Sequence, residues 1–159
     1  MKIKIICPGH LKEKYLKEAQ KEYLKRLSAF CKFEIIEVED EKTPDNPTDR
    51  ERELILQKEG ERILSKIKDG DYCFSLEIKG KERTSEEFAE KLNSLMIHGK
   101  SSLVFIIGGS LGLGENVLKI KNESFSFSKM TLPHQLIRIN LLEQIYRAFK
   151  IINNEPYHK

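Results

Sequence analysis

The sequence predicts an α/β domain in which a mostly parallel β-sheet is covered by helices on both faces. Short apolar runs of strand character alternate with longer runs whose apolar residues recur at helical spacing, the pattern typical of such sheets. Two strand-like runs end in turns, one rich in glycine and one polar with a proline. Ligand sites of α/β sheets are usually built from such turns at the ends of strands. The 159 residues contain no internal repeat, low-complexity segment or convincing linker, which predicts a single domain over residues 1–159.

The N-terminal part supplies two strands and a helix. Residues 2–7 form a buried first strand, which the turn at Pro8 ends. Residues 11–30 have helical period, because an apolar residue recurs every fourth position while lysines and glutamates fill the opposite face. Residues 33–38 form the second strand, and the acidic, proline-containing stretch 39–47 is a surface loop.

Two capping signals then mark helix starts. Thr48 and Glu51 have the spacing of a capping box, which satisfies free N–H groups at a helix N-terminus. The inward residues of that helix are Leu54, Ile55, Ile63, Leu64 and Ile67. After a third strand at 72–78, Thr84 caps a helix for which Gly99 fits a left-handed C-terminal cap.

The stretch 103–158 organises the rest. Its expected elements are a strand at 103–107, a glycine-rich turn at 108–114 that leads to a helix, a short strand at 125–128, a polar turn at 129–134 and a helix at 135–152. The last helix is apolar around much of its circumference, so it is covered either within its own domain or by a second subunit. Its Arg138 and Arg147 either pair structurally or reach a phosphate.

Composition excludes several classes. No apolar run approaches the ~20 residues that span a bilayer, and the N-terminus does not resemble a signal peptide. The three cysteines show neither metal-ligand spacing nor a disulfide framework, which favours buried thiols in a reducing cytoplasm and no metal site. Basic residues concentrate at both ends around an acidic middle, so the chain either turns a basic face to a polyanion or has solvated helix faces.

The glycine turn admits several readings. It lacks the G-x-G-x-x-G spacing of dinucleotide sites and a Walker lysine. Ser110 has the G-x-S-x-G spacing of a hydrolase nucleophile, with His134 or His158 as possible bases, although the chain is short for a hydrolase. The glycines either only tighten the turn or expose backbone to a ligand. In the second case, an adenine ring would lie between Leu76, Ile78 and Leu132.

The C-terminal tail is expected to be disordered, as most termini are. Nevertheless, ending on Tyr157 and His158 is unusual for a tail without a role. A tyrosine can stack on a nucleobase, and a histidine titrates near neutral pH.

A resemblance to a known family is carried by motifs spread over the whole chain. They are the first strand with its Pro8-Gly9 turn, the strand at Leu76, Ile106-Ile107-Gly108-Gly109, the run from Phe127 to His134, Tyr146-Arg147-Ala148 and Pro156-Tyr157-His158. Together they closely resemble the RlmH family, ribosomal RNA large subunit methyltransferase H, of the SPOUT class. The run 128–134 and the Tyr-His ending are its most specific parts.

The resemblance implies an α/β knot fold with a C-terminal trefoil knot, homodimerisation and use of S-adenosylmethionine. It implies methylation of N3 of a pseudouridine in 23S ribosomal RNA of the assembled ribosome. The implied cofactor-binding residues are Leu76, Gly108, Phe127, Ser128, Lys129, Met130, Thr131 and Leu132. The implied catalytic residues are Arg147, Tyr157 and His158.

Roles for the catalytic residues follow from their chemistry. His158 is the expected general base because its reference pKa is near neutral and its tail can close over a site. Tyr157 would position the base, and Arg147 would hold a phosphate or developing negative charge. In relatives the third residue of the glycine turn varies, and here it is Ser110, which argues against a nucleophile. A catalytically silent RNA- or ribosome-binding module on the same fold is the main alternative.

Overall fold

The computed structural model describes all 159 residues and contains one five-stranded sheet in the order β2-β1-β4-β3-β5. Its strands are β1 (Lys2–Pro8), β2 (Lys32–Val38), β3 (Tyr72–Leu76), β4 (Ser102–Ile106) and β5 (Glu123–Phe125). Every neighbouring pair is parallel. The predicted fold class is confirmed, and the sheet is parallel throughout.

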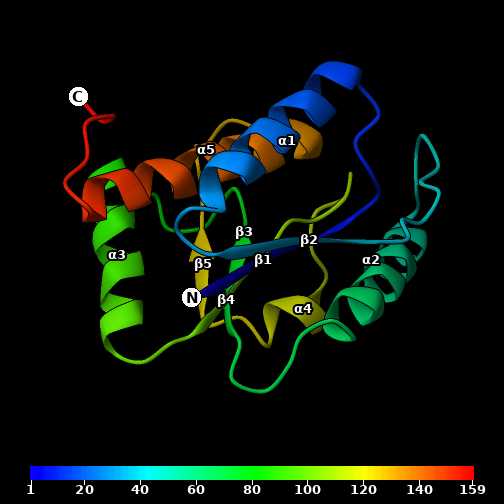
Figure 1. Cartoon of the computed structure of the whole chain (residues 1–159). Coiled ribbons are helices and arrows are strands. Elements are labelled where there is room, and N and C mark those ends of the chain that lie inside the picture. Colours follow the sequence, from blue (N-terminus) through cyan, green and yellow to red (C-terminus); the bar gives the residue numbers. More distant parts are fainter.

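Helices cover both faces of the sheet (Figure 1). One face carries α1 (Lys14–Leu27), α3 (Ser85–Ile97) and α5 (His134–Ile152), and the other carries α2 (Asp49–Leu64) and the short α4 (Glu115–Leu118). Strand β1 shows how the sequence produces two layers, because successive side chains of a strand point to opposite faces. Ile5 belongs to the larger apolar cluster under α5, and Ile6 to the smaller one under α2.

Local sequence signals correctly predicted three helix ends. Thr48 and Thr84 both form the predicted capping boxes, with the third helical residue completing each one. Gly99 follows α3 with a φ of 82°, as a left-handed cap requires.

Several details of the prediction were wrong. The helix expected at 11–30 spans Lys14–Leu27, and the strand expected at 72–78 ends at Leu76. Leu54 was expected to point inward but is 50% exposed. The buried stripe of α2 runs through Ile55, Glu59 and Ile63, and Leu54 is rotated by about 100° from Ile55. The strand expected at 125–128 instead pairs over Glu123–Phe125, because its partner strand β3 ends at Leu76. Ser126 continues only as an isolated bridge to Glu82.

The three cysteines give a test of the packing. Burial raises the pKa of Cys7, Cys31 and Cys73 to about 11 in each case. At pH 8 we therefore expect Ellman's reagent to label the native protein at least roughly 100-fold more slowly than free cysteine, because only the thiolate reacts. All three should react at once in guanidinium chloride. A native thiol that labels as fast as free cysteine would show that the packing around it is wrong.

Candidate functional site

A cavity of about 720 Å³ opens at the carboxyl ends of β3, β4 and β5. Three stretches line it: residues 76–79 after β3, the glycine turn 107–113 after β4, and parts of 125–137, which leads into α5. Carboxyl ends of neighbouring parallel strands share one edge of the sheet, so turns that are distant in sequence meet there. The two turns that the sequence singled out thus form one site.

The glycine turn folds back on itself. A Cβ on Gly108 would stand 2.3 Å from the carbonyl oxygen of Gly112, so no side chain fits at position 108. Gly112 has a φ of 85°, and its N–H donates to the carbonyl of Gly109. Tightness of the turn therefore accounts for Gly108 and Gly112, and the turn lines the cavity with backbone.

The opposite wall is formed by apolar side chains and held by one serine. Leu76, Ile78 and Leu132 all line the cavity. The buried hydroxyl of Ser126 lies 3.0 Å from the carbonyl oxygen of Ile78 and 2.9 Å from that of Ser128, so it joins the loop after β3 to the turn after β5. Apolar walls beside exposed backbone suit a planar heterocycle such as adenine.

The structure places most of the predicted cofactor-binding residues around this cavity. Those that line it are Leu76, Gly108, Phe127, Ser128, Met130, Thr131 and Leu132. Lys129 does not line it and is exposed to solvent.

A second cavity of about 240 Å³ adjoins the first and has no hydrophobic residue in its wall. The two share Gly109, Ser110 and His134. Burial, and secondarily the charge of Arg138, lower the pKa of His134. The polar cavity therefore contains an imidazole that stays neutral to lower pH than usual.

Arg138 fixes α5 against the ends of β1 and β2. Its side chain is 2% exposed, and Nη1 donates to Glu37 at 2.7 Å. Nη2 lies 3.4 Å from the carbonyl oxygen of Gly9. The sequence allowed Arg138 either to pair within the protein or to reach a phosphate, and the structure shows the pairing within the protein.

Ser110 lacks the partner that a serine nucleophile needs. Its hydroxyl lies 3.2 Å from that of Thr43, and no histidine bonds to it. The arrangement therefore does not support the hydrolase reading, in which an imidazole must take the serine proton.

The C-terminal tail is packed onto α5, contrary to the expectation of disorder. The Tyr157 ring lies 4.7 Å from the guanidinium carbon of Arg147 and 4.9 Å from the ring centroid of Tyr146. Its hydroxyl donates to Glu143 at 3.0 Å. Burial, together with this carboxylate, raises the pKa of Tyr157 to about 12, so the phenol stays protonated at neutral pH.

The contacts of His158 define its tautomer. Nδ1 lies 3.1 Å from Nη1 of Arg147, and Nε2 lies 2.7 Å from Oε1 of Glu86. A guanidinium has no acceptor, so Nδ1 must accept this hydrogen bond and Nε2 must carry the proton. The basic nitrogen of His158 thus faces an arginine in this arrangement.

The predicted site residues form two groups within one chain. Arg147, Tyr157 and His158 line neither cavity. Ile137 is the last residue of α5 at the larger cavity, and Arg147 lies ten residues, or about 15 Å, further along the helix. The tail lies instead beside the N-terminus of α3 (Figure 1).

Sequence reasoning missed several residues of both groups. Glu86 and Ser126 had no recognisable motif. Glu143 was not predicted beside Arg147, although its position four residues before that arginine indicates a helical ion pair. Glu59 lies among many charged residues of α2, and no motif distinguished it. The one nearby sequence signal of close packing was Gly60, a glycine in mid-helix, where a Cβ would lie 2.3 Å from Oδ1 of Asn116.

Comparisons with known proteins match the whole chain. The family model described as "Predicted SPOUT methyltransferase" matches residues 1–158. The proteins named ribosomal RNA large subunit methyltransferase H from Bacillus cytotoxicus, Bacillus thuringiensis and Limosilactobacillus reuteri are each 58% identical over 159 residues, which is 100% of both chains.

The histidine tautomers provide a direct test of the docked tail. We expect long-range ¹H–¹⁵N NMR to show neutral His158 protonated at Nε2. His98 is the internal contrast, because its Nδ1 lies 2.7 Å from the carbonyl oxygen of Ser94 and must carry the proton. An Nδ1-protonated His158, or one that averages between tautomers, would contradict the docked arrangement.

Proposed function

The chain belongs to the SPOUT methyltransferase family, in the RlmH branch, and we propose that it methylates large-subunit ribosomal RNA with S-adenosylmethionine as the donor. The observation that carries this proposal is the single cavity formed by the Gly108 turn and the turn at 125–132. Its volume of about 720 Å³ fits a nucleoside-sized ligand. In this proposal residues 1–159 act as one catalytic domain.

The proposed acceptor is N3 of a pseudouridine in 23S ribosomal RNA. S-Adenosylmethionine, when bound, supplies a methyl group already activated by a sulfonium. The protein therefore has mainly to align that methyl with the ring nitrogen and to accept the N3 proton. The methyl–sulfur bond breaks, the methyl–N3 bond forms, and the N3 proton passes to the general base.

His158 is the proposed general base, with Tyr157 positioning the acceptor base and Arg147 offsetting negative charge on its oxygens. In the docked tail, Nδ1 of His158 accepts a hydrogen bond from Arg147. His158 can therefore take a proton only after Nδ1 leaves Arg147. Tail movement over the acceptor would bring about that change.

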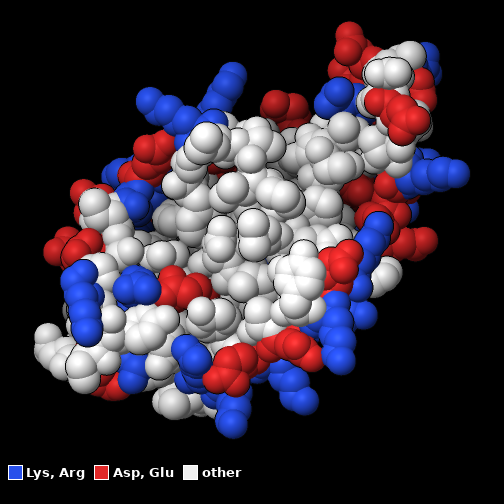
Figure 2. All heavy atoms as spheres, turned by 90° about the horizontal axis from the view of Figure 1, so that it is seen from above, with Lys and Arg blue, Asp and Glu red and all other residues white.

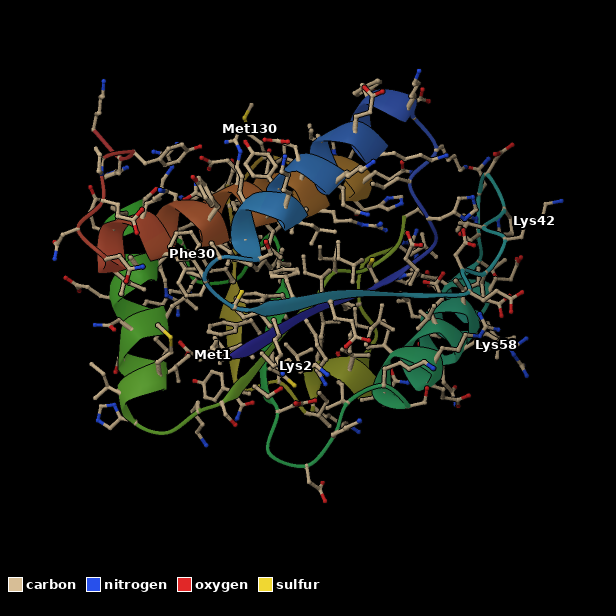
Figure 3. The ribbon with its side chains drawn as sticks, in the orientation of Figure 1. Met1, Lys2, Phe30, Lys42, Lys58 and Met130 are labelled. Atoms are coloured by element: carbon tan, nitrogen blue, oxygen red, sulfur yellow. The ribbon has the colours of Figure 1, made fainter.

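A homodimer would join the two groups of residues into one site. Figure 2 shows a broad uncharged area, ringed by charges, on the face seen from above the α1 and α5 side of Figure 1. Met130 is 77% exposed and points outward in Figure 3, and Leu136 is 39% exposed. Exposed apolar surface of this kind marks association sites. In the proposed dimer, the tail of one subunit completes the donor cavity of the other.

The remaining parts of the proposal follow from the family. The donor would be held in a C-terminal trefoil knot, in a cytoplasmic enzyme that acts on assembled ribosomes. In this proposal the ribosome would supply much of the substrate binding. No helix has the length and apolar character needed to cross a bilayer. The alternative, a catalytically silent RNA-binding module, would not bind the methyl donor, so donor binding distinguishes it from the proposed enzyme.

Donor binding is tested by substituting the apolar wall. Isothermal titration calorimetry should detect S-adenosylmethionine binding to the purified protein. Ile78→Ser should weaken it roughly 10-fold, because apolar contact with the adenine is lost. Ile97→Ser is the matched control, since Ile97 is exposed and lies outside the cavity. Absence of binding to the wild-type protein would favour the silent module, and equal effects of both variants would place the donor elsewhere.

Subunit mixing tests the shared site. His158→Ala subunits lack the tail base, and Gly108→Ala subunits should lack the donor site because the added Cβ collides with Gly112. Mixed after dissociation in equal amounts, they should regain roughly a quarter of wild-type activity, because half of the dimers are mixed and each has one intact site. Activity no higher than that of the separate variants would mean that each chain uses its own tail.

A further inference from the structure

Glu59 is a buried carboxylate with a free oxygen at the wall of the polar cavity. It lies on α2 and is 5% exposed. Its Oε2 accepts a hydrogen bond from the N–H of Glu41 at 2.9 Å, whereas Oε1 has no hydrogen-bond partner. Buried charged groups are normally paired or fully hydrogen-bonded. Oε1 of Glu59 is not fully enclosed, because Nε of Arg138 is the one fully enclosed side-chain atom that has no partner, so Oε1 is open to a bound group.

No cation forms a salt bridge with Glu59, although the charge of Arg62 partly offsets the rise in its pKa that burial causes. Lys42 lines the polar cavity but is exposed, and its side chain extends outward, as does that of Lys58 (Figure 3). Arg62, one helical turn further along α2, pairs with Glu41 at 2.6 Å. Burial raises the pKa of Glu59, and the nearby charge of Asp40 raises it further. The fold thus maintains an unfavourable charge at this point.

The position of Glu59 is next to the junction of the two cavities. A Cβ on Gly109 would stand 3.2 Å from Oε1 of Glu59, so the glycine leaves this oxygen uncovered. Gly109 is one of the residues that line both cavities. A group bound in the polar cavity against Glu59 would therefore lie next to a ligand in the larger cavity.

The polar cavity suits a small heterocycle that has both donors and acceptors. Its wall has no hydrophobic residue and combines three carboxylates with two lysines, two histidines and neutral polar groups: Asp40, Glu41, Glu59, Lys12, Lys42, His10, His134, Thr43, Ser110 and Gln135. The volume of about 240 Å³ equals that of roughly eight water molecules at ~30 Å³ each, which is adequate for a pyrimidine ring with two oxygens.

We propose that the polar cavity holds the acceptor base, and that Glu59 accepts a hydrogen bond from the N1–H of pseudouridine, which uridine lacks. This inference rests on the proposed function. Pseudouridine is joined to ribose through C5, so N1 and N3 both carry hydrogens on either side of the C2 carbonyl. In uridine the sugar occupies N1. With N3 turned to the donor cavity, N1–H can face Oε1 of Glu59, which makes Glu59 the residue that selects pseudouridine.

Glu59→Gln tests this role with little change in shape. The N–H of Glu41 can only donate, so it should bind the amide oxygen of the glutamine. The NH₂ group of the glutamine then faces the cavity. Because both this NH₂ group and the N1–H of pseudouridine are donors, no hydrogen bond can form between them. Removing an unpaired buried charge should leave the melting temperature unchanged or higher. Glu53→Gln, on the exposed face of α2, is the matched control.

The measurement compares two substrates. Ribosomes carry either pseudouridine or, from cells lacking the pseudouridine synthase, uridine at the target position. Wild-type protein and Glu53→Gln should prefer pseudouridine in kcat/KM. The kcat/KM of Glu59→Gln for pseudouridine-containing ribosomes should fall roughly 10- to 100-fold, the usual effect of losing a hydrogen bond to a charged group. It should then approach the kcat/KM for uridine-containing ribosomes. Its affinity for S-adenosylmethionine, measured by calorimetry, should not change.

Two outcomes would overturn the inference. One is a folded Glu59→Gln that keeps both the wild-type preference for pseudouridine and the wild-type affinity for the donor. The other is unchanged preference with weakened donor binding, which would place the ammonium group of the donor at Glu59 instead. A wild-type protein that binds the donor but methylates neither substrate would overturn the proposed function itself, and this inference with it.

Discussion

The structure depends on one close backbone contact, in which Gly112 packs against the Cα of Gly108. This contact is possible because Gly108 has no side chain. This contact folds the turn after β4 tightly enough to lie between the ends of its neighbours β1 and β3. The same turn then borders an apolar cavity on one side and a polar cavity on the other. A wall made of backbone keeps the two spaces in contact, as transfer of a group between two bound molecules requires.

Helix α5 connects this region to the catalytic residues proposed for the tail. Near its start, Arg138 fixes the helix to the ends of β1 and β2. Near its end, Glu143 and Arg147 hold Tyr157. Within a single chain, Arg147, Tyr157 and His158 line neither cavity. The uncharged surface over this side of the molecule (Figure 2) offers a physical solution, in which a second copy brings its tail to the cavity.

Local sequence signals predicted the elements well, because caps, periodicity and glycine turns act over a few residues. Thr48, Thr84 and Gly99 are examples. Features that depend on distant contacts were not predictable. Leu54 and Glu59 lie on the same helix, yet the apolar residue is exposed and the charged one buried, because the facing loops decide which stripe is covered. Leu76, Ile78, Leu132 and the glycine turn were singled out from the sequence itself, whereas residues 127–131 were assigned through the family resemblance. The docking of the tail depends on partners as far away as Glu86.

Methyl transfer to ribosomes from cells that lack this gene is the most direct test of the account. The purified protein and isotopically labelled S-adenosylmethionine would be incubated with those ribosomes, and the ribosomal RNA would be digested and analysed by mass spectrometry. The account predicts one labelled nucleoside, N3-methylpseudouridine, from the large subunit. Transfer should disappear when a competing adenosyl ligand occupies the cavity beside Gly108. A protein that binds the donor but leaves the ribosomal RNA unlabelled would contradict it.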